Sequence, residues 1–154
     1  MCIRDRQIAR ELEAGPVNGI FSSPAVRCRE SLEPLSRASG VPVVVLPGFK
    51  DTLGYKAPAG WENADRPGGD PLGGAQSAGS AFAAWQEIQG RVPAGHAVLC
   101  SYGDIVPAFL AFLSGAYGMD MPAKNNKKGA VFTVVLDGEA VRMSGREPSQ
   151  DFPR

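Results

Sequence analysis

Short apolar strands alternate with helical segments along most of the sequence, and this alternation constrains the fold more than any other feature. Runs typical of buried strands occupy residues 17–22 (VNGIFS), 41–46 (VPVVVL) and 97–101 (AVLCS). Segments with helical spacing or helix-start signals occupy residues 23–39, 75–92 and 103–114. The pattern predicts an α/β domain of three layers, a mostly parallel sheet with helices on both faces.

Two other segments break this alternation. Residues 47–74 are rich in Gly, Pro and Asp, which predicts a long loop of the kind that often carries function. Residues 130–136 and 140–143 alternate in polarity around Asp137-Gly138, which predicts a β-hairpin.

Composition and charge exclude several classes of protein. The chain has 154 residues, which suits one domain, and its 16 basic residues equal its 16 acidic ones, so neither a nucleic acid nor a membrane is expected as partner. No apolar run spans a membrane and no secretory signal begins the chain, so the expected location is cytoplasmic. Cys2, Cys28 and Cys100 show no paired spacing, so neither a disulfide framework nor a metal site is expected. We expect Cys28 and Cys100 to be small buried residues in a reducing compartment. No cofactor is expected.

The first six residues, MCIRDR, resemble the translation of a transposon-end sequencing adapter. We therefore interpret residues 1–6 as an artefact, residues 7–145 as the domain and residues 146–154 as a C-terminal tail. Residues 7–14 have helical spacing and end at Gly15-Pro16, typical of a helix whose start is missing. The gene is then expected to continue upstream of Gln7.

Polar residues follow the first strand. Ser22-Ser23-Pro24 closes it, Ser23 is predicted to cap the next helix, and Arg27 lies one turn inside that helix. Helix N-termini attract anions, and a guanidinium matches the geometry of phosphate. The segment therefore indicates a phosphate site, the alternative being a surface arginine on an ordinary capped helix.

A second strand end reads Ser101-Tyr102-Gly103. A strand, a glycine turn and a helix start at Asp104 predict that Tyr102 lies at the carboxyl edge of the sheet, where α/β proteins bind ligands. A core tyrosine packed at a strand end is the alternative.

Together these two segments resemble the Ser-Ser-Pro-x-x-Arg and Ser-His-Gly elements of the histidine phosphatase (phosphoglycerate mutase-like) superfamily, and Lys128-Gly129-Ala130-Val131 resembles the start of a late strand in its bacterial members. The resemblance runs from Gln7 to about Met143. It is greatest to small phosphohistidine-phosphatase-type domains, including those fused behind a Nudix hydrolase domain.

The resemblance implies hydrolysis without a metal, through a phosphohistidine formed on an Arg-His-Gly motif. Two arginines and a second histidine then hold the phosphate, and a carboxylic acid protonates the leaving group. The sequence contains no Arg-His-Gly, and its one histidine, His96, is predicted to be a solvent-facing turn residue at the wrong end of its strand. The family's first strand, inside the parallel sheet, is then missing, so we expect unpaired edges or a sheet closed around the gap. Tyr102 occupies the position of the second histidine and offers only a neutral hydrogen bond.

Carried onto this chain, the resemblance assigns phosphate binding to Arg27, Ser23 and Gly103, with Tyr102 at the second-histidine position. Asp51 is the first candidate for the proton donor and Glu62 the second, although both fit solvated loop charges as well. Three functions remain open. The chain is a fragment of a phosphatase, inactive as given. Alternatively, it is a pseudo-phosphatase that binds a phosphorylated small molecule or phosphoprotein. The third hypothesis is a regulatory domain behind an upstream Nudix-type domain.

Overall fold

In a computed structural model, the chain is described at residues 12, 15–51, 59, 71–122, 129–138 and 140–146. Three strands form one parallel sheet: β1 (Val17–Ser22) lies between β2 (Val43–Val45) and β3 (His96–Cys100). The register pairs Ser22 with Val45 on one side and with Cys100 on the other. Because β1 and β3 pair directly, no other strand lies between them; the expectation that a first strand is missing stays a prediction.

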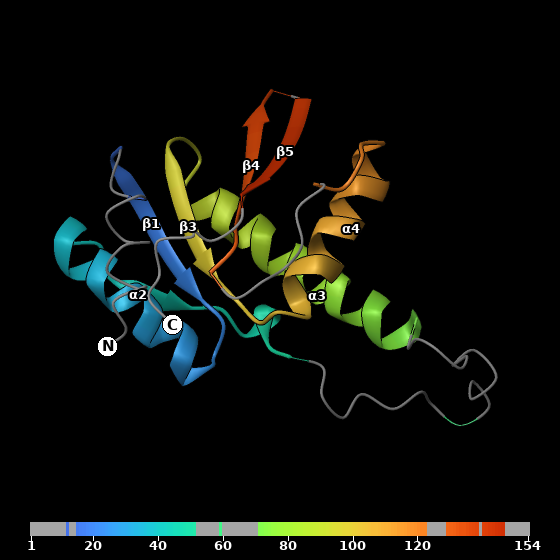
Figure 1. The fold of residues 1–154 in the computed structure, drawn as a ribbon, viewed down its shortest axis with the longest axis horizontal. Helices are drawn as coiled ribbons and strands as arrows, with labels where there is room; N and C mark the ends of the chain where they lie inside the picture. The colour runs from blue at the N-terminus through green and yellow to red at the C-terminus, as the bar shows by residue number, and fades with distance from the viewer. Residues whose placement is uncertain are drawn as a thin grey trace.

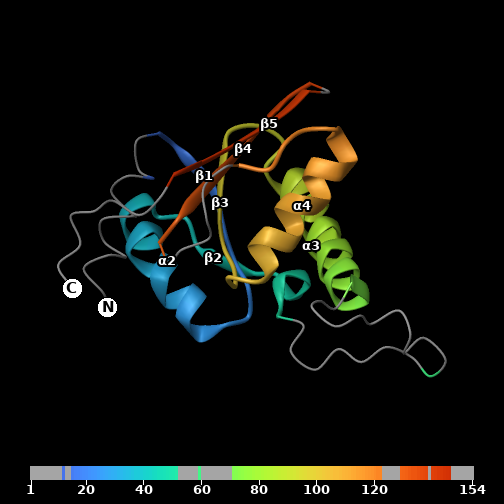
Figure 2. The same ribbon diagram turned by 45° about the vertical axis from the view of Figure 1, so that its right-hand side comes forward.

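Strand β1 holds the two halves of the core together. Successive side chains of a strand point to opposite faces, and both Ile20 (0% exposed) and Phe21 (1% exposed) are buried. Ile20 packs into a cluster with helix α2, and Phe21 packs into a larger cluster with helices α3 and α4. Helices therefore cover both faces of the sheet (Figures 1 and 2).

Helix α2 (Val26–Ser39) covers one face of the sheet. Its buried side chains Cys28, Leu32 and Leu35 are spaced four and three residues apart, so they form one stripe along the helix. The helix ends at Gly40, whose φ of +73° places it in the left-handed region and whose N–H donates to the carbonyl of Ser36. The sequence predicted this ending.

The other face is covered by the 3₁₀ turn η1 (Pro47–Phe49) and by helices α3 (Pro71–Arg91) and α4 (Ile105–Tyr117). Aromatic rings join these elements: Phe109 of α4 meets Phe49 at 6.1 Å and Trp85 of α3 at 5.7 Å, both edge to face. This packing fixes the segment after β2 against the helices, and so determines where Asp51 lies.

Strands β4 (Val131–Asp137) and β5 (Ala140–Arg146) form a separate antiparallel hairpin. Its last pair is Asp137 with Ala140, and Gly138 adopts a φ of +60° in the turn, as a tight two-residue connection requires. Val134 and Met143 pack against the larger core cluster. The predicted hairpin is confirmed, with its first strand shifted by one residue and its second strand extended from Met143 to Arg146.

The predicted three-layer α/β fold with a parallel sheet is confirmed, but several boundaries differ. Residues 41–46 were predicted to be a strand buried on both faces. Only Val43–Val45 form β2, and Val45 is 40% exposed because this strand lies at the sheet edge. Strand β3 is likewise only partly buried. Helix α3 begins at Pro71, inside the predicted loop, since proline is well tolerated in a first helical turn. The predicted helix at 7–14 lies outside the described residues except for Leu12, which packs near Ile20.

The contact between η1 and α3 gives a test of this packing. A Cβ added at Gly48 would lie 2.6 Å from the backbone oxygen of Ser80 and 2.8 Å from the Cβ of Ala84. Backbone cannot yield as a side chain can, so we expect Gly48→Ala to lower the free energy of unfolding by about 1–3 kcal/mol in urea denaturation.

The matched control is Gly90→Ala, in α3 with open space around the added methyl. It should raise stability by about 0.5–1 kcal/mol, since alanine favours the helix. Equal stability of the two variants would contradict the close approach of η1 to α3.

Candidate functional site

The connections after β1 and β3 leave the sheet on opposite faces. Helix α2 follows β1 and packs on the face of Ile20, whereas α4 follows β3 and packs on the face of Phe21. In open α/β sheets such a switch in direction creates a crevice at the carboxyl ends of the strands, where ligands bind. The Ser23 N–H donates to the Cys100 carbonyl at 2.9 Å and holds the two strand ends together.

Ser23 does not cap α2, so that prediction is wrong. The N-cap is Ala25, with extended backbone and no side-chain cap bond, and the helix begins at Val26. Ser23 instead continues the line of β1 into the interior, fully buried. Its Oγ has no hydrogen-bond partner of normal geometry among the described residues. A buried, unsatisfied hydroxyl is costly, and here it lies at the predicted ligand-binding edge.

Arg27 and Tyr102, predicted from separate motifs, are in contact. The guanidinium carbon of Arg27 lies 4.7 Å from the centroid of the Tyr102 ring, a cation–π arrangement. Arg27 remains exposed, so its N–H groups stay available on the solvent side. The ring therefore holds the guanidinium over the strand ends.

Asp51 is electrostatically coupled to the same site. Ser101 Oγ donates to the Phe49 carbonyl at 3.2 Å, which ties η1 to the end of β3. Partial burial and then the Asp51 carboxylate raise the pKa of the Tyr102 phenol, against the lowering effect of Arg27. Tyr102 is therefore a neutral phenol at physiological pH, limited to neutral hydrogen bonds.

The remaining predicted residues have less defined surroundings. Gly103 is exposed and lies just before Asp104, the N-cap of α4, whose side chain makes no cap bond. Asp104 also raises the pKa of Tyr102, so a second negative charge lies nearby. Glu62 lies outside the described residues.

Sequence reasoning missed Cys28 as a chemical group. Its thiol lies in the first turn of α2 and is 4% exposed. The pKa of the Cys28 thiol is lowered to about 6, chiefly by a hydrogen bond with the Cys100 side chain. Burial raises this pKa, whereas the Ser23 side chain and the Arg27 charge lower it. The available signal was its place one residue after Arg27 at a helix start, where thiols ionise more readily. Cys28 is buried as expected, whereas Cys100 is only partly buried.

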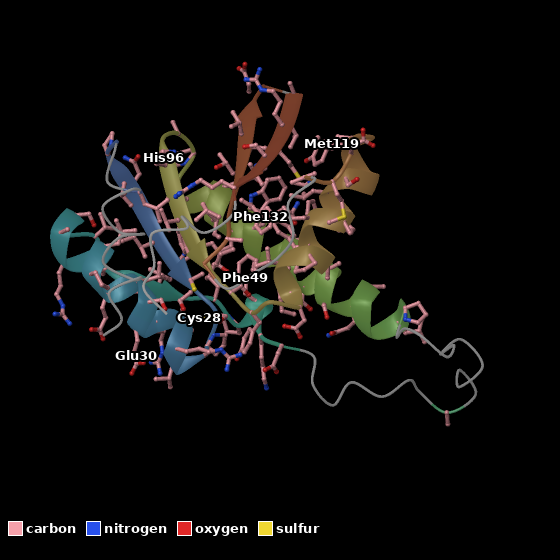
Figure 3. All side chains as sticks on the ribbon, in the orientation of Figure 1. Cys28, Glu30, Phe49, His96, Met119 and Phe132 are labelled. Carbon is pink, nitrogen blue, oxygen red and sulfur yellow. The ribbon has the colours of Figure 1, made fainter. Side chains whose placement is uncertain are left out.

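His96 lies far from these residues. It is the first residue of β3 rather than a turn residue, it is exposed as predicted, and its backbone N–H donates to Asn18 Oδ1 at 2.9 Å. Cys100, at the other end of the strand, is four residues away, roughly 13 Å along an extended chain. Figure 3 shows His96 and Cys28 at opposite ends of the sheet. The prediction that His96 lies at the wrong end is confirmed.

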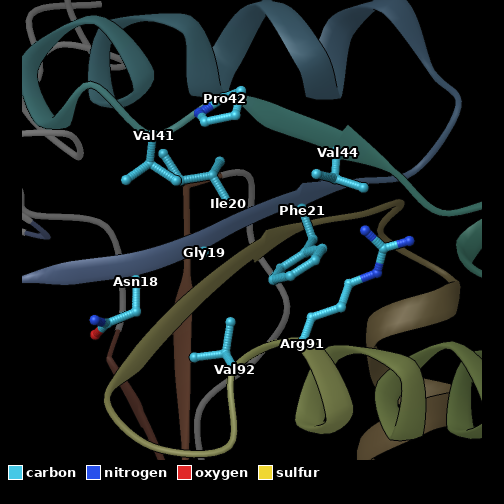
Figure 4. A pocket seen from close by; sticks show the side chains of 9 residues that line it. All are labelled: Asn18, Gly19, Ile20, Phe21, Val41, Pro42, Val44, Arg91 and Val92. Carbon is cyan, nitrogen blue, oxygen red and sulfur yellow. The ribbon is translucent and has the colours of Figure 1, made fainter.

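A shallow pocket of about 190 Å³ lies away from this edge, near the amino ends of β1 and β2 and the last turn of α3 (Figure 4). None of the predicted site residues lines it. Its one charged side chain, Arg91, is paired with Glu87 at 2.7 Å.

In the described part of the chain, no cluster of three or more potential metal ligands occurs. No helix there is both long and apolar enough to span a bilayer.

The comparisons with known proteins identify the fold. YhfR of Bacillus stearothermophilus superposes with a TM-score of 0.60 at 15% sequence identity, over 90% of this chain and 78% of YhfR. A mycobacterial glucosyl-3-phosphoglycerate phosphatase superposes with a TM-score of 0.55 at 16% identity, over 77% of this chain and 66% of the phosphatase. No family model and no curated protein matches the sequence. The chain therefore has a phosphoglycerate mutase-like α/β fold, as the sequence predicted.

The lowered pKa of Cys28 predicts a pH dependence of stability. The folded thiol has a pKa of about 6 against an ordinary 9.0, so the unfolded chain binds more protons between these values. Stability from this group is then fully present above the ordinary pKa and is lost as pH falls toward 6.

We expect the urea midpoint of the parent chain to rise between pH 6 and pH 9 relative to that of Cys28→Ser. A step in thiolate ultraviolet absorbance near pH 6 should be present only when Cys28 is present. Parallel pH profiles of the two proteins would contradict the lowered pKa. Cys2→Ser is the control and should behave as the parent.

Proposed function

We propose that this chain is a phosphatase-like domain of the histidine phosphatase superfamily. In our proposal it binds the phosphoryl group of a phosphomonoester or phosphohistidine at Arg27 and does not hydrolyse it as given. One observation carries the proposal: Arg27, held by Tyr102, stands at the start of α2 beside the buried, unpartnered hydroxyl of Ser23. The fold shared with a phosphatase supports it.

Each residue has a role in this proposal. The Arg27 guanidinium donates two parallel hydrogen bonds to phosphate oxygens, and the Ser23 hydroxyl supplies a neutral donor. The turn at Gly103, before α4, provides backbone N–H groups at a helix start. Asp51 is the residue that protonates the leaving group in an intact enzyme.

The surrounding charges make this binding weak. Asp51, Asp104 and the Cys28 thiolate all lie near enough to affect the pKa of Tyr102, and they repel an anion. Because Arg27 binds the anion against these negative charges, we expect a dissociation constant of about 1 mM for inorganic phosphate. This corresponds to a binding free energy of about −4 kcal/mol.

Hydrolysis in this family needs a histidine nucleophile, and this chain offers none at the site. The only histidine is His96, at the opposite end of β3. Tyr102, with its raised pKa, is a poor substitute for a charged donor to the transition state. The leading proposal is thus a metal-independent phosphatase whose nucleophile is encoded upstream of Gln7. A reducing cytoplasm is the compartment we propose, because the three cysteines show no paired spacing in the sequence.

The second candidate is a pseudo-phosphatase that binds a phosphorylated small molecule or phosphoprotein, with or without an upstream Nudix-type domain. The stacking of Tyr102 on Arg27 favours it, since tyrosine holds the guanidinium without providing a charged donor. Genomic DNA upstream of Gln7 distinguishes the two candidates. An Arg-His-Gly codon run there supports the enzyme, and its absence supports the pseudo-enzyme.

Phosphate titration tests the site itself. Backbone amide signals of Arg27 and Gly103 should move with inorganic phosphate, and Arg27→Ala should weaken binding about tenfold or more, as loss of a charge-assisted pair implies. The matched control is Arg37→Ala, which removes the same charge from the far end of α2 and should leave the affinity unchanged. Equal losses in both variants would mean that only overall charge matters.

Turnover of p-nitrophenyl phosphate tests the missing nucleophile. The parent chain should show none above background, and Tyr102→His should show none either, because a restored donor still lacks a nucleophile. Turnover that disappears with Arg27→Ala would overturn the proposal that the chain is inactive as given.

A further inference from the structure

Two cysteines from distant parts of the sequence meet behind the Arg27 site. Cys28 is the first member of the buried stripe of α2, with Leu32 and Leu35 behind it. Cys100 ends β3 and, like Val98 two residues earlier, packs against the cluster that contains those leucines. Both side chains therefore point into the interface between α2 and the sheet, at its carboxyl end.

The two thiols lie close together at this end of the interface. The Ser23 N–H donates to the Cys100 carbonyl at 2.9 Å, the Cys100 side chain lowers the pKa of the Cys28 thiol, and no disulfide joins the two. The backbone around them is fixed, since the Ser23 N–H bonds to the Cys100 carbonyl and the Cys28 N–H bonds to the Ala25 carbonyl. Such bracing holds the two sulfurs together without requiring movement of the strands.

The surroundings of Cys28 suit reaction with a small polar oxidant. Its sulfur lies at a helix start beside the positive charge of Arg27, and the fully buried Ser23 hydroxyl beside it lacks a partner of normal geometry. With Cys28 only 4% exposed, a molecule of the size of hydrogen peroxide fits the site better than a bulky disulfide.

We propose that Cys28 and Cys100 form a hydroperoxide-reactive dithiol, in which Cys28 is oxidised first and Cys100 resolves it as an intramolecular disulfide. This inference does not depend on phosphate binding at Arg27. It assigns the chain a modification site, with hydroperoxides as the reacting class.

The chemistry balances in two steps. The Cys28 thiolate attacks one peroxide oxygen, an S–O bond forms as the O–O bond breaks, and the leaving hydroxide takes a proton to become water. Cys100 then attacks the sulfur of the Cys28 sulfenic acid. The S–S bond forms, the S–O bond breaks, and a second water leaves with the Cys100 proton. Two thiols and one peroxide give one disulfide and two waters.

The test uses the full chain with Cys2→Ser, so that the third thiol takes no part. Hydrogen peroxide should cause the loss of two hydrogen atoms in the intact mass, and a peptide map should join the Cys28 and Cys100 peptides. The reaction rate should rise with pH around 6, the pKa of Cys28. Cys28→Ser should react about tenfold more slowly, because the remaining thiol is mostly protonated at neutral pH.

Cys100→Ser separates the two roles. It should still be oxidised at Cys28, at a rate that changes with the pKa of Cys28, but it should stop at a Cys28 sulfenic acid, which dimedone traps. Circular dichroism checks that each serine variant is folded, and Cys28→Ala repeats the test if Cys28→Ser is not. Oxidation that gives only intermolecular dimers, or a Cys28→Ser protein that reacts as fast as the parent, would overturn the proposal.

Discussion

The structure depends on β1, which forms contacts at both of its edges and on both of its faces. Its edges pair with β2 and β3, and its two faces contribute Ile20 to one half of the core and Phe21 to the other. No other described strand has this double role, since β2 and β3 each pair only with β1. A six-residue segment therefore determines both where the helices pack and which strand ends become neighbours. The candidate site is a consequence of that central position.

The site combines features that favour and oppose an anion. Arg27 at a helix start, beside a buried hydroxyl, favours phosphate, whereas Asp51 and the Cys28 thiolate oppose it. Tyr102 connects these groups, because its ring orients the guanidinium while its phenol remains neutral. Tyr102 thus orients the Arg27 guanidinium but does not provide the charged hydrogen-bond donor that catalysis in the family requires. In both functions that we propose, this division separates phosphate binding from catalysis.

Local signals in the sequence predicted much of the fold but not its closure. Some signals act through the nearby backbone, so the helix, hairpin and strand that they mark could be predicted. These signals are Gly40, the Asp137-Gly138 turn and the β-branched run before Leu46. Strand pairing depends on residues far apart, so the edge position of β2 was missed. Two separate motifs singled out Arg27 and Tyr102, which the structure brings into contact, whereas their roles and that of Asp51 stay predictions. The partnership of Cys28 with Cys100 was missed, because it spans 72 residues (100 − 28) and neither cysteine belongs to a recognisable pair.

The pairing of β1 with β3 also determines when the site can exist during folding. The unit β1–α2–β2 closes over a short stretch of chain, and the β4–β5 hairpin is still more local. Ser22 and Cys100, by contrast, are 78 residues apart (100 − 22), so their pairing requires a long loop to close. We infer that the crevice between these strands forms late, after the local units. The candidate site therefore depends on the pairing in the sheet that joins the most distant parts of the sequence, and not on any local unit alone.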